Sequence, residues 1–153
     1  MKRFIIDSSS LIHFEEKYPY DILPTLWDEV FKLFEANILF SVREVYEELE
    51  DSQQIWKDYE EYFRELTEEE SDAMNKILTD ERFEVFKING MKEDGPWADP
   101  HLIACAMVNE TVSVVSQENL NRNPKRKIAF VCKECGIPYM DFLEFLREAN
   151  VKI

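Results

Sequence analysis

Glycine, proline, cysteine and histidine are all scarce in this sequence. Its 153 residues include three Gly, six Pro, three Cys and two His. So few glycines and prolines leave little room for long irregular loops. No stretch of apolar residues approaches the length needed to cross a bilayer, and residues 1–7 are too short for a signal peptide. We therefore expect a compact protein of the cytoplasm, without a membrane partner.

The few cysteines fit reduced thiols rather than a disulfide framework. Cys132 and Cys135 form a C-x-x-C motif, which can open a zinc site or a redox pair. No second Cys/His pair stands at ligand spacing, because His13 and His101 are far apart. The favoured interpretation is one turn of helix that carries two small apolar residues.

Basic residues are also in short supply. There are 18 Lys and Arg against 32 Asp and Glu, a formal charge of −14. This balance argues against non-specific binding of nucleic acid and suits a basic protein partner. A small basic cluster stands out against it, formed by Arg122, Lys125, Arg126 and Lys127.

The chain is rich in apolar residues, and their spacing matches that of helices in some segments and of strands in others. Hydrophobic residues make up 45% of it, enough to bury a real core in one domain over residues 1–153. Apolar runs predict strands at 3–6, 38–40 and 112–115, with weaker candidates at 127–130 and 137–139. Helical spacing predicts helices at 21–36, 42–51, 53–66, 67–78, 100–109 and 140–150. Short apolar strands separated by helices predict an α/β fold with three layers, α/β/α, around a mainly parallel sheet.

Some local predictions are more detailed. One of Ser8, Ser9 and Ser10 is expected to cap a short helix, and Ser41 another. Thr67 and Glu70 predict a capping box. Residues 83–86 are ambiguous between strand and loop, and the Asn-Gly pair at 89–90 indicates a turn.

Carboxylates stand where apolar segments stop. Asp7 follows the first strand and Glu118 follows the strand at 112–115, so both should open on the rim formed by the carboxyl ends of a parallel sheet. Asp99 lies in line with the buried stripe of its helix. In the helix at 42–51, Glu48 and Glu50 flank the apolar stripe about equally, and periodicity does not choose between them. Acids in such places are costly to bury without a cation, and a divalent metal is the simplest one.

Each acid also has an ordinary explanation. Asp99 before Pro100 is a good helix N-cap, and Asp7 before three serines suits a turn. Glu48 is one acid among many on an acidic helix, and Glu118 could begin a loop. The joint occurrence of the acids in strand-end and helix-flank positions favours a shared site.

In these segments the chain resembles the PIN-domain nucleases, the fold of VapC-type toxins. The matching pieces are Phe4-Ile5-Ile6-Asp7-Ser8-Ser9, Val45-Tyr46-Glu47-Glu48-Leu49, Ala98-Asp99-Pro100-His101-Leu102-Ile103-Ala104 and Val114-Val115-Ser116-Gln117-Glu118. They occur in the family's order and cover nearly the whole chain. Two positions depart from the family's pattern, since Glu118 replaces the usual Asp and Ser116 the usual Thr.

The resemblance implies a Mg²⁺- or Mn²⁺-dependent endoribonuclease, the toxin of a toxin–antitoxin pair. It implies that Asp7, Glu48, Asp99 and Glu118 bind the metal and act in catalysis, and it selects Glu48 over Glu50. Ser9 and Ser116 take the polar support positions. The basic residues at 122–127 become candidates to touch the RNA backbone, with a solvated loop as the equal alternative. An antitoxin protein and a homodimer are further implied partners.

Two other functions fit the sequence. A binding module of the same fold would hold metal weakly and engage a basic protein, which the charge of −14 and Glu118 favour. A phosphatase-type hydrolase is less favoured, because Ser9 stands where a second Asp is wanted and no P-loop glycines occur. His101 is expected to be an exposed helix residue, and Trp27, Trp56 and Trp97 are expected in the core or an interface.

Overall fold

The protein is built around a parallel sheet. The computed structural model describes residues 1–92, 95–118 and 127–153. Its strands are β1 (Arg3–Ile6), β2 (Leu39–Val42), β3 (Phe63–Arg64), β4 (Val112–Val115) and β5 (Tyr139–Met140). They form one five-stranded sheet in the order β3-β2-β1-β4-β5, and every described pairing is parallel.

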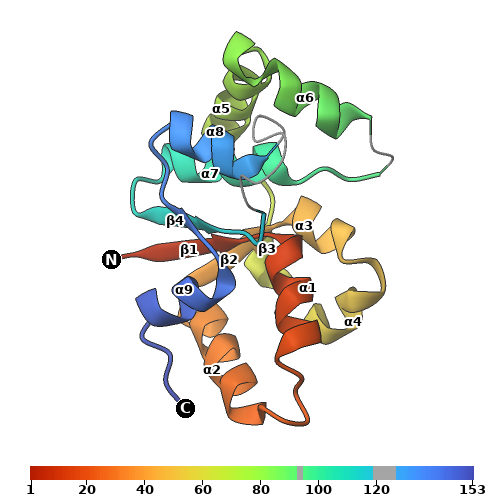
Figure 1. Cartoon of the computed structure of the whole chain (residues 1–153), viewed down its shortest axis with the longest axis vertical. Helices are drawn as coiled ribbons and strands as arrows, with labels where there is room; N and C mark the ends of the chain where they lie inside the picture. The colour runs from red at the N-terminus through yellow and green to blue at the C-terminus, as the bar shows by residue number, and fades with distance from the viewer. Residues whose placement is uncertain (93–94, 119–126) are drawn as a thin grey trace.

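Helices cover both faces of this sheet, as the three-layer prediction required (Figure 1). One face carries α5 (Glu68–Leu78), α6 (Glu84–Met91), α7 (Asp99–Val108) and α8 (Ile128–Glu134). The other carries α1 (Ser8–Lys17), α2 (Pro24–Glu35) and α9 (Phe142–Glu148), while α3 (Arg43–Glu48) and α4 (Gln53–Trp56) lie toward one end. Because both faces are covered, β1, β2 and β4 are apolar and buried almost throughout.

An aromatic cluster fills the layer of α1, α2, α4 and α9. The Phe14 ring stacks on Trp27 with centroids 4.0 Å apart and on Phe142 at 4.8 Å. Trp27 in turn stacks on Trp56 at 5.5 Å. Both tryptophans are buried, which confirms the prediction that they belong to the core.

Several predicted elements are wrong in type or length. The single helix predicted at 53–66 is instead α4, a 3-10 segment Lys57–Tyr62 and the edge strand β3. Residues 83–86 are neither strand nor loop, since they enter α6 after a 3-10 turn at Glu81–Phe83. The weak strand candidate at 127–130 forms the start of α8, whose Ile128, Ala129, Val131 and Cys132 are all buried.

Two predicted serine caps are also wrong. Ser41 lies inside β2, where its hydroxyl donates a 2.6 Å hydrogen bond to the Ile6 carbonyl of the neighbouring strand. The cap of α1 is Asp7, not one of the three serines that follow it. The Thr67–Glu70 capping box is confirmed at the start of α5.

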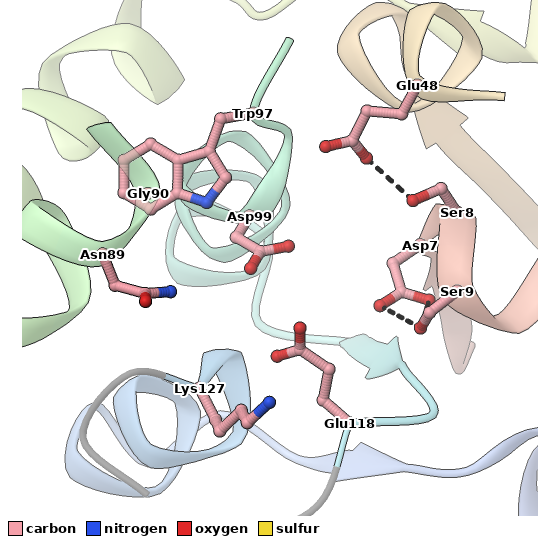
Figure 2. A pocket seen from close by; sticks show the side chains of 10 residues that line it. All are labelled: Asp7, Ser8, Ser9, Glu48, Asn89, Gly90, Trp97, Asp99, Glu118 and Lys127. Atoms are coloured by element: carbon pink, nitrogen blue, oxygen red, sulfur yellow. Dashed lines mark hydrogen bonds between the residues drawn. The ribbon is translucent and has the colours of Figure 1, made fainter. Parts of the chain in front are cut away.

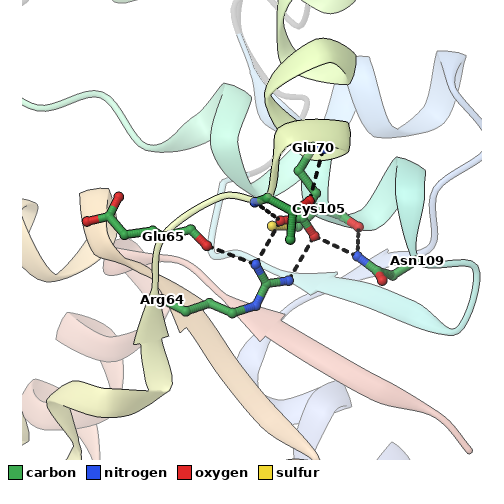
Figure 3. A network of polar contacts seen from close by, with 6 residues as sticks. Arg64, Glu65, Glu70, Cys105 and Asn109 are labelled. Carbon is green, nitrogen blue, oxygen red and sulfur yellow. Dashed lines mark hydrogen bonds and ion pairs between the residues drawn. The ribbon is translucent and has the colours of Figure 1, made fainter.

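A partly buried ion pair ties β3 to the helical layer above it (Figure 3). The Arg64 guanidinium meets both Glu70 oxygens, at 2.7 and 2.8 Å. Glu70 also accepts hydrogen bonds from Asn109 Nδ2 of the α7 end and from the Thr67 amide. The Glu70 side chain therefore joins β3, α5 and α7 at one point, which holds the short edge strand in place.

Within the described part of the chain, no helix is both long and apolar enough to cross a membrane.

Candidate functional site

The sheet order places a cavity beyond the ends of β1 and β4. From β1 the chain adds β2 and β3 on one side of the sheet and then β4 and β5 on the other side of β1. The direction in which strands are added therefore reverses between β1 and β4. In open parallel sheets ligands bind outside the carboxyl ends of the strands at this switch point. A cavity of about 240 Å³ opens here, and its lining includes Asp7, Glu48, Asp99 and Glu118 (Figure 2).

Asp7 is fixed by the turn from β1 into α1. Its amide donates to the Val115 carbonyl at 3.0 Å, which extends the pairing with β4 by one residue. Its carboxylate caps α1 by accepting the Ser10 amide at 2.8 Å. The Ser9 hydroxyl lies 2.8 and 2.9 Å from the two Asp7 oxygens and accepts the Gln117 amide at 3.1 Å. Asp7 is thus only 3% exposed, and the segment after β4 helps to hold it.

Glu48, the last residue of α3, bridges two other elements. Its Oε1 accepts a 2.8 Å hydrogen bond from the Ser8 hydroxyl, and its Oε2 accepts the Ala98 amide at 3.0 Å. Glu50 is exposed, lies in a 3-10 turn with a φ of 51°, and is not part of the cavity lining. Periodicity did not choose between Glu48 and Glu50. In the structure Glu48, and not Glu50, lies with the other acids.

Asp99 does not have the capping role that its position before Pro100 suggests. It is the first residue of α7, and the N-cap is Ala98. Its carboxylate is left to face the cavity, as Figure 2 shows. Glu118 has a structural partner, because its Oε2 accepts the Ile128 amide at the start of α8 at 3.2 Å. The Ser116 hydroxyl accepts the Glu118 amide, also at 3.2 Å.

Burial raises the pKa of Asp7, Glu48 and Asp99, and repulsion from neighbouring acids adds to the rise for Glu48 and Asp99. Burial raises the pKa of Asp7, against hydrogen bonds from Ser116, Ser10 and Ser9. Burial also raises the pKa of Glu48, opposed by the Ala98 amide and the Ser8 hydroxyl. The pKa of Asp99 is raised well above its ordinary value by burial and then by the charges of Glu118, Asp7 and Glu48. The combined negative potential of these carboxylates favours the binding of a cation or a proton in the cavity.

The remaining lining residues come from the other side of the cavity. Asn89 and Gly90 of α6 lie there with Trp97, opposite Asp7 and Ser9 (Figure 2). Sequence reasoning missed all three as site residues. It took the Asn-Gly pair at 89–90 for a turn, although both residues are helical. It grouped Trp97 with the other tryptophans, although Trp97 is only partly buried and precedes α7.

Of the predicted basic cluster, Lys127 lines the cavity. Arg122, Lys125 and Arg126 lie outside the described residues. His101 is partly buried and is not part of the cavity lining, and burial lowers its pKa. The C-x-x-C motif falls on α8 and its C-cap, where burial raises the pKa of Cys132 and so disfavours a thiolate.

The whole site falls within a region that matches a known family model. Residues 4–153 match the family described as Domain of unknown function (DUF4411). The chain belongs to this family. All four cavity acids of this DUF4411 chain lie inside the matched region. Searches among curated proteins and among solved structures each found no match.

The DUF4411 cavity has the donor chemistry for a hard divalent cation but not a finished set of ligands. Carboxylate oxygens are the ligands that Mg²⁺ and Mn²⁺ prefer. Among the described residues, however, no three His, Cys, Asp or Glu side chains already converge as a group that could hold one ion. Glu48 and Glu118 are turned toward backbone amides. Each of these amides competes with an ion for one oxygen of its glutamate.

Proposed function

We propose that this protein is a divalent-metal-dependent endoribonuclease that hydrolyses RNA phosphodiester bonds. The supporting observation is the convergence of Asp7, Glu48, Asp99 and Glu118 on one cavity at the switch point of the sheet. Four acids from separate segments repel one another there, and a cation is the simplest way to make the arrangement stable. This is the chemistry expected of a PIN-type nuclease, to which the sequence motifs are similar.

The donor set fits Mg²⁺ or Mn²⁺, with Asp7 and Asp99 as the principal ligands. Both are short carboxylates at the ends of rigid elements, and α1 and α7 each begin at or next to them. Glu48 and Glu118 have longer side chains and line the same cavity. When bound, the ion lowers the pKa of a water molecule and neutralises charge on the phosphate.

The chain's own residues supply the rest of the reaction. Glu48 accepts the proton of the attacking water, a role for which its raised pKa suits it better than an ordinary glutamate. The Ser8 hydroxyl orients Glu48, and Ser9 holds the carboxylate of Asp7. Lys127, which lines the cavity, contacts a phosphate of the RNA backbone.

The proposal extends to the biology that accompanies such nucleases. The protein acts in the cytoplasm as the toxin of a toxin–antitoxin pair. An antitoxin protein covers the acidic cavity, and two copies of the chain form a homodimer.

Cleavage of single-stranded RNA with Mn²⁺, Mg²⁺ or excess EDTA tests the activity. Asp7→Asn and Asp99→Asn should each abolish metal-dependent cleavage. Asn remains a good N-cap, so the variant at position 7 should stay folded. Glu48→Gln should be strongly impaired, whereas the matched Glu50→Gln should cleave normally. Equal cleavage in EDTA, or full activity of Asp99→Asn, would remove the metal mechanism.

One observation favours a second candidate, a binding module with weakened catalysis. Both oxygens of Glu48 already have hydrogen-bond donors, and the acids do not converge as a ligand group among the described residues. Calorimetric titration with Mn²⁺ separates the two functions. The nuclease requires binding that Asp99→Asn removes, and the binding module predicts little heat from either protein.

A further inference from the structure

The wall of the cavity that carries no acid has the features of a second subsite. Trp97, Asn89 and Gly90 line it, on the far side of Asp99 from Asp7 (Figure 2). Asn89 and Gly90 have no role in holding a metal or activating water in the proposed reaction, and Trp97 contributes only a hydrogen bond to Asp99. The cavity therefore offers an aromatic ring and an amide directly beside the four carboxylates.

Gly90 fixes the position of the Trp97 ring. A Cβ atom on Gly90 would lie 2.1 Å from two carbons of the indole, so only glycine lets the ring rest against α6. Phe86, one turn earlier on the same helix, contacts the indole with ring centroids 5.0 Å apart. Trp97 is still partly exposed. The result is a rigid aromatic surface that remains open to the cavity.

Asn89 stands next to this ring with its side chain uncommitted. Its side chain is partly buried, lines the cavity and makes no hydrogen bond to any described residue. A carboxamide offers two donors and an acceptor, which is the pattern found on the edges of nucleobases. The amide atoms of Asn89 are not fully buried, so they are accessible to solvent and to a ligand in the cavity.

We infer that Trp97 and Asn89 form a nucleobase subsite, which holds one base of the substrate beside the reacting phosphate. The indole stacks on the base and Asn89 hydrogen-bonds to its edge. This inference rests on the proposed function for the position of the phosphate. The ring and the amide share one cavity of about 240 Å³ with the four acids. In a duplex the base would be paired and stacked and could not reach the ring.

Binding of fluorescein-labelled RNA heptamers, followed by anisotropy, tests the subsite. Ca²⁺ replaces Mg²⁺, and the ligands are oligo(A), oligo(C), oligo(U), a matching duplex and a heptamer of abasic sugar–phosphate units. Trp97→Ala should weaken single-strand binding about 5- to 100-fold. Gly90→Ala should also weaken it, by displacing the ring, and Asn89→Ala should weaken it for some bases more than others. The control is Ile88→Ala, an exposed neighbour on α6 that does not line this cavity.

The abasic heptamer separates stacking from loss of fold. Wild type and Trp97→Ala should bind it equally, because it has the backbone charge but no bases. If Trp97→Ala does not fold, Asn89→Ala carries the test, since the Asn89 side chain makes no hydrogen bond to a described residue. Affinities of Asn89→Ala and folded Trp97→Ala equal to that of Ile88→Ala would overturn the subsite.

The subsite and the nuclease can fail separately. If Asp99→Asn abolishes cleavage but the Trp97 and Asn89 variants bind all heptamers normally, the nuclease stands and the subsite is wrong. If wild type cleaves no RNA with Mg²⁺ or Mn²⁺ yet binds single strands through Trp97 and Asn89, the subsite stands and the proposed function is wrong.

Discussion

The ion pair between Arg64 and Glu70 should make the stability of this protein depend on acid pH. The Glu70 side chain is 1% exposed and has donors on both oxygens. Hydrogen bonding from Arg64, against the cost of burial, lowers the pKa of Glu70 from 4.5 to about 2. A carboxyl with a lowered pKa stabilises the folded state when it is ionised and loses that contribution when it is protonated.

The size of the effect follows from the shift. A difference of this size between the folded and unfolded pKa corresponds to about 3 kcal/mol. The Arg64 side chain is 33% exposed, so solvent screens part of the attraction. We therefore expect about 2 kcal/mol from Glu70 at neutral pH. This contribution is complete above the unfolded pKa near 4.5 and is lost as the pH falls toward the folded value of about 2.

Urea unfolding at pH 7, 5, 4 and 3 measures this contribution. Glu70→Gln should be less stable than wild type by about 2 kcal/mol at pH 7, and the two curves should approach each other as the pH falls. Glu144→Gln is the matched control, because Glu144 pairs with Arg147 at 3.3 Å on the surface and should have little effect. A constant difference between Glu70→Gln and wild type from pH 7 to pH 3 would refute the reasoning.

Three further predictions concern the cap of α5 and the cavity. Thr67→Ala removes one half of the capping box and should lower the free energy of unfolding by about 1 kcal/mol, as measured in urea. Ser9→Ala removes the hydroxyl that lies against both oxygens of Asp7 and should weaken Mn²⁺ binding in calorimetry; Ser9→Thr, which keeps a hydroxyl, should restore it. Lys127→Gln should raise KM for RNA cleavage about 5- to 10-fold with kcat nearly unchanged, since a phosphate contact positions the strand; a selective loss of kcat would contradict that role.

The sheet could be predicted from sequence because its central strands are short apolar runs with clear ends. The run at 3–6 and the run at 112–115 became β1 and β4 with the predicted bounds. The acids that follow them met at one edge because parallel strands end on the same side. Periodicity could not tell which glutamate of the helix at 42–51 joins them, since this depends on how α3 ends; the resemblance selected Glu48, and Glu48 is the one that lines the cavity.

The failures have physical reasons in tertiary contacts. Asn89 and Gly90 have the local signature of a turn, but Gly90 is needed in α6 because the Trp97 ring occupies the space of a side chain. Asp99 has the signature of an N-cap, but α7 begins one residue earlier than that role requires. The edge strand β3 has only two residues and is held by the Arg64–Glu70 ion pair, which no local pattern indicates.

The double role of Asp7 affects how relatives of this chain should be compared. The same carboxylate closes the first turn of α1 and faces the cavity, so folding alone gives a reason to keep Asp or Asn at that position. A relative in which the acidic cavity no longer has a function could still carry Asp or Asn at position 7. Asp99 serves no helix cap, and its burial among other acids has a cost. Replacement of the residue at position 99 is therefore the more informative sign that a family member has given up an acidic centre.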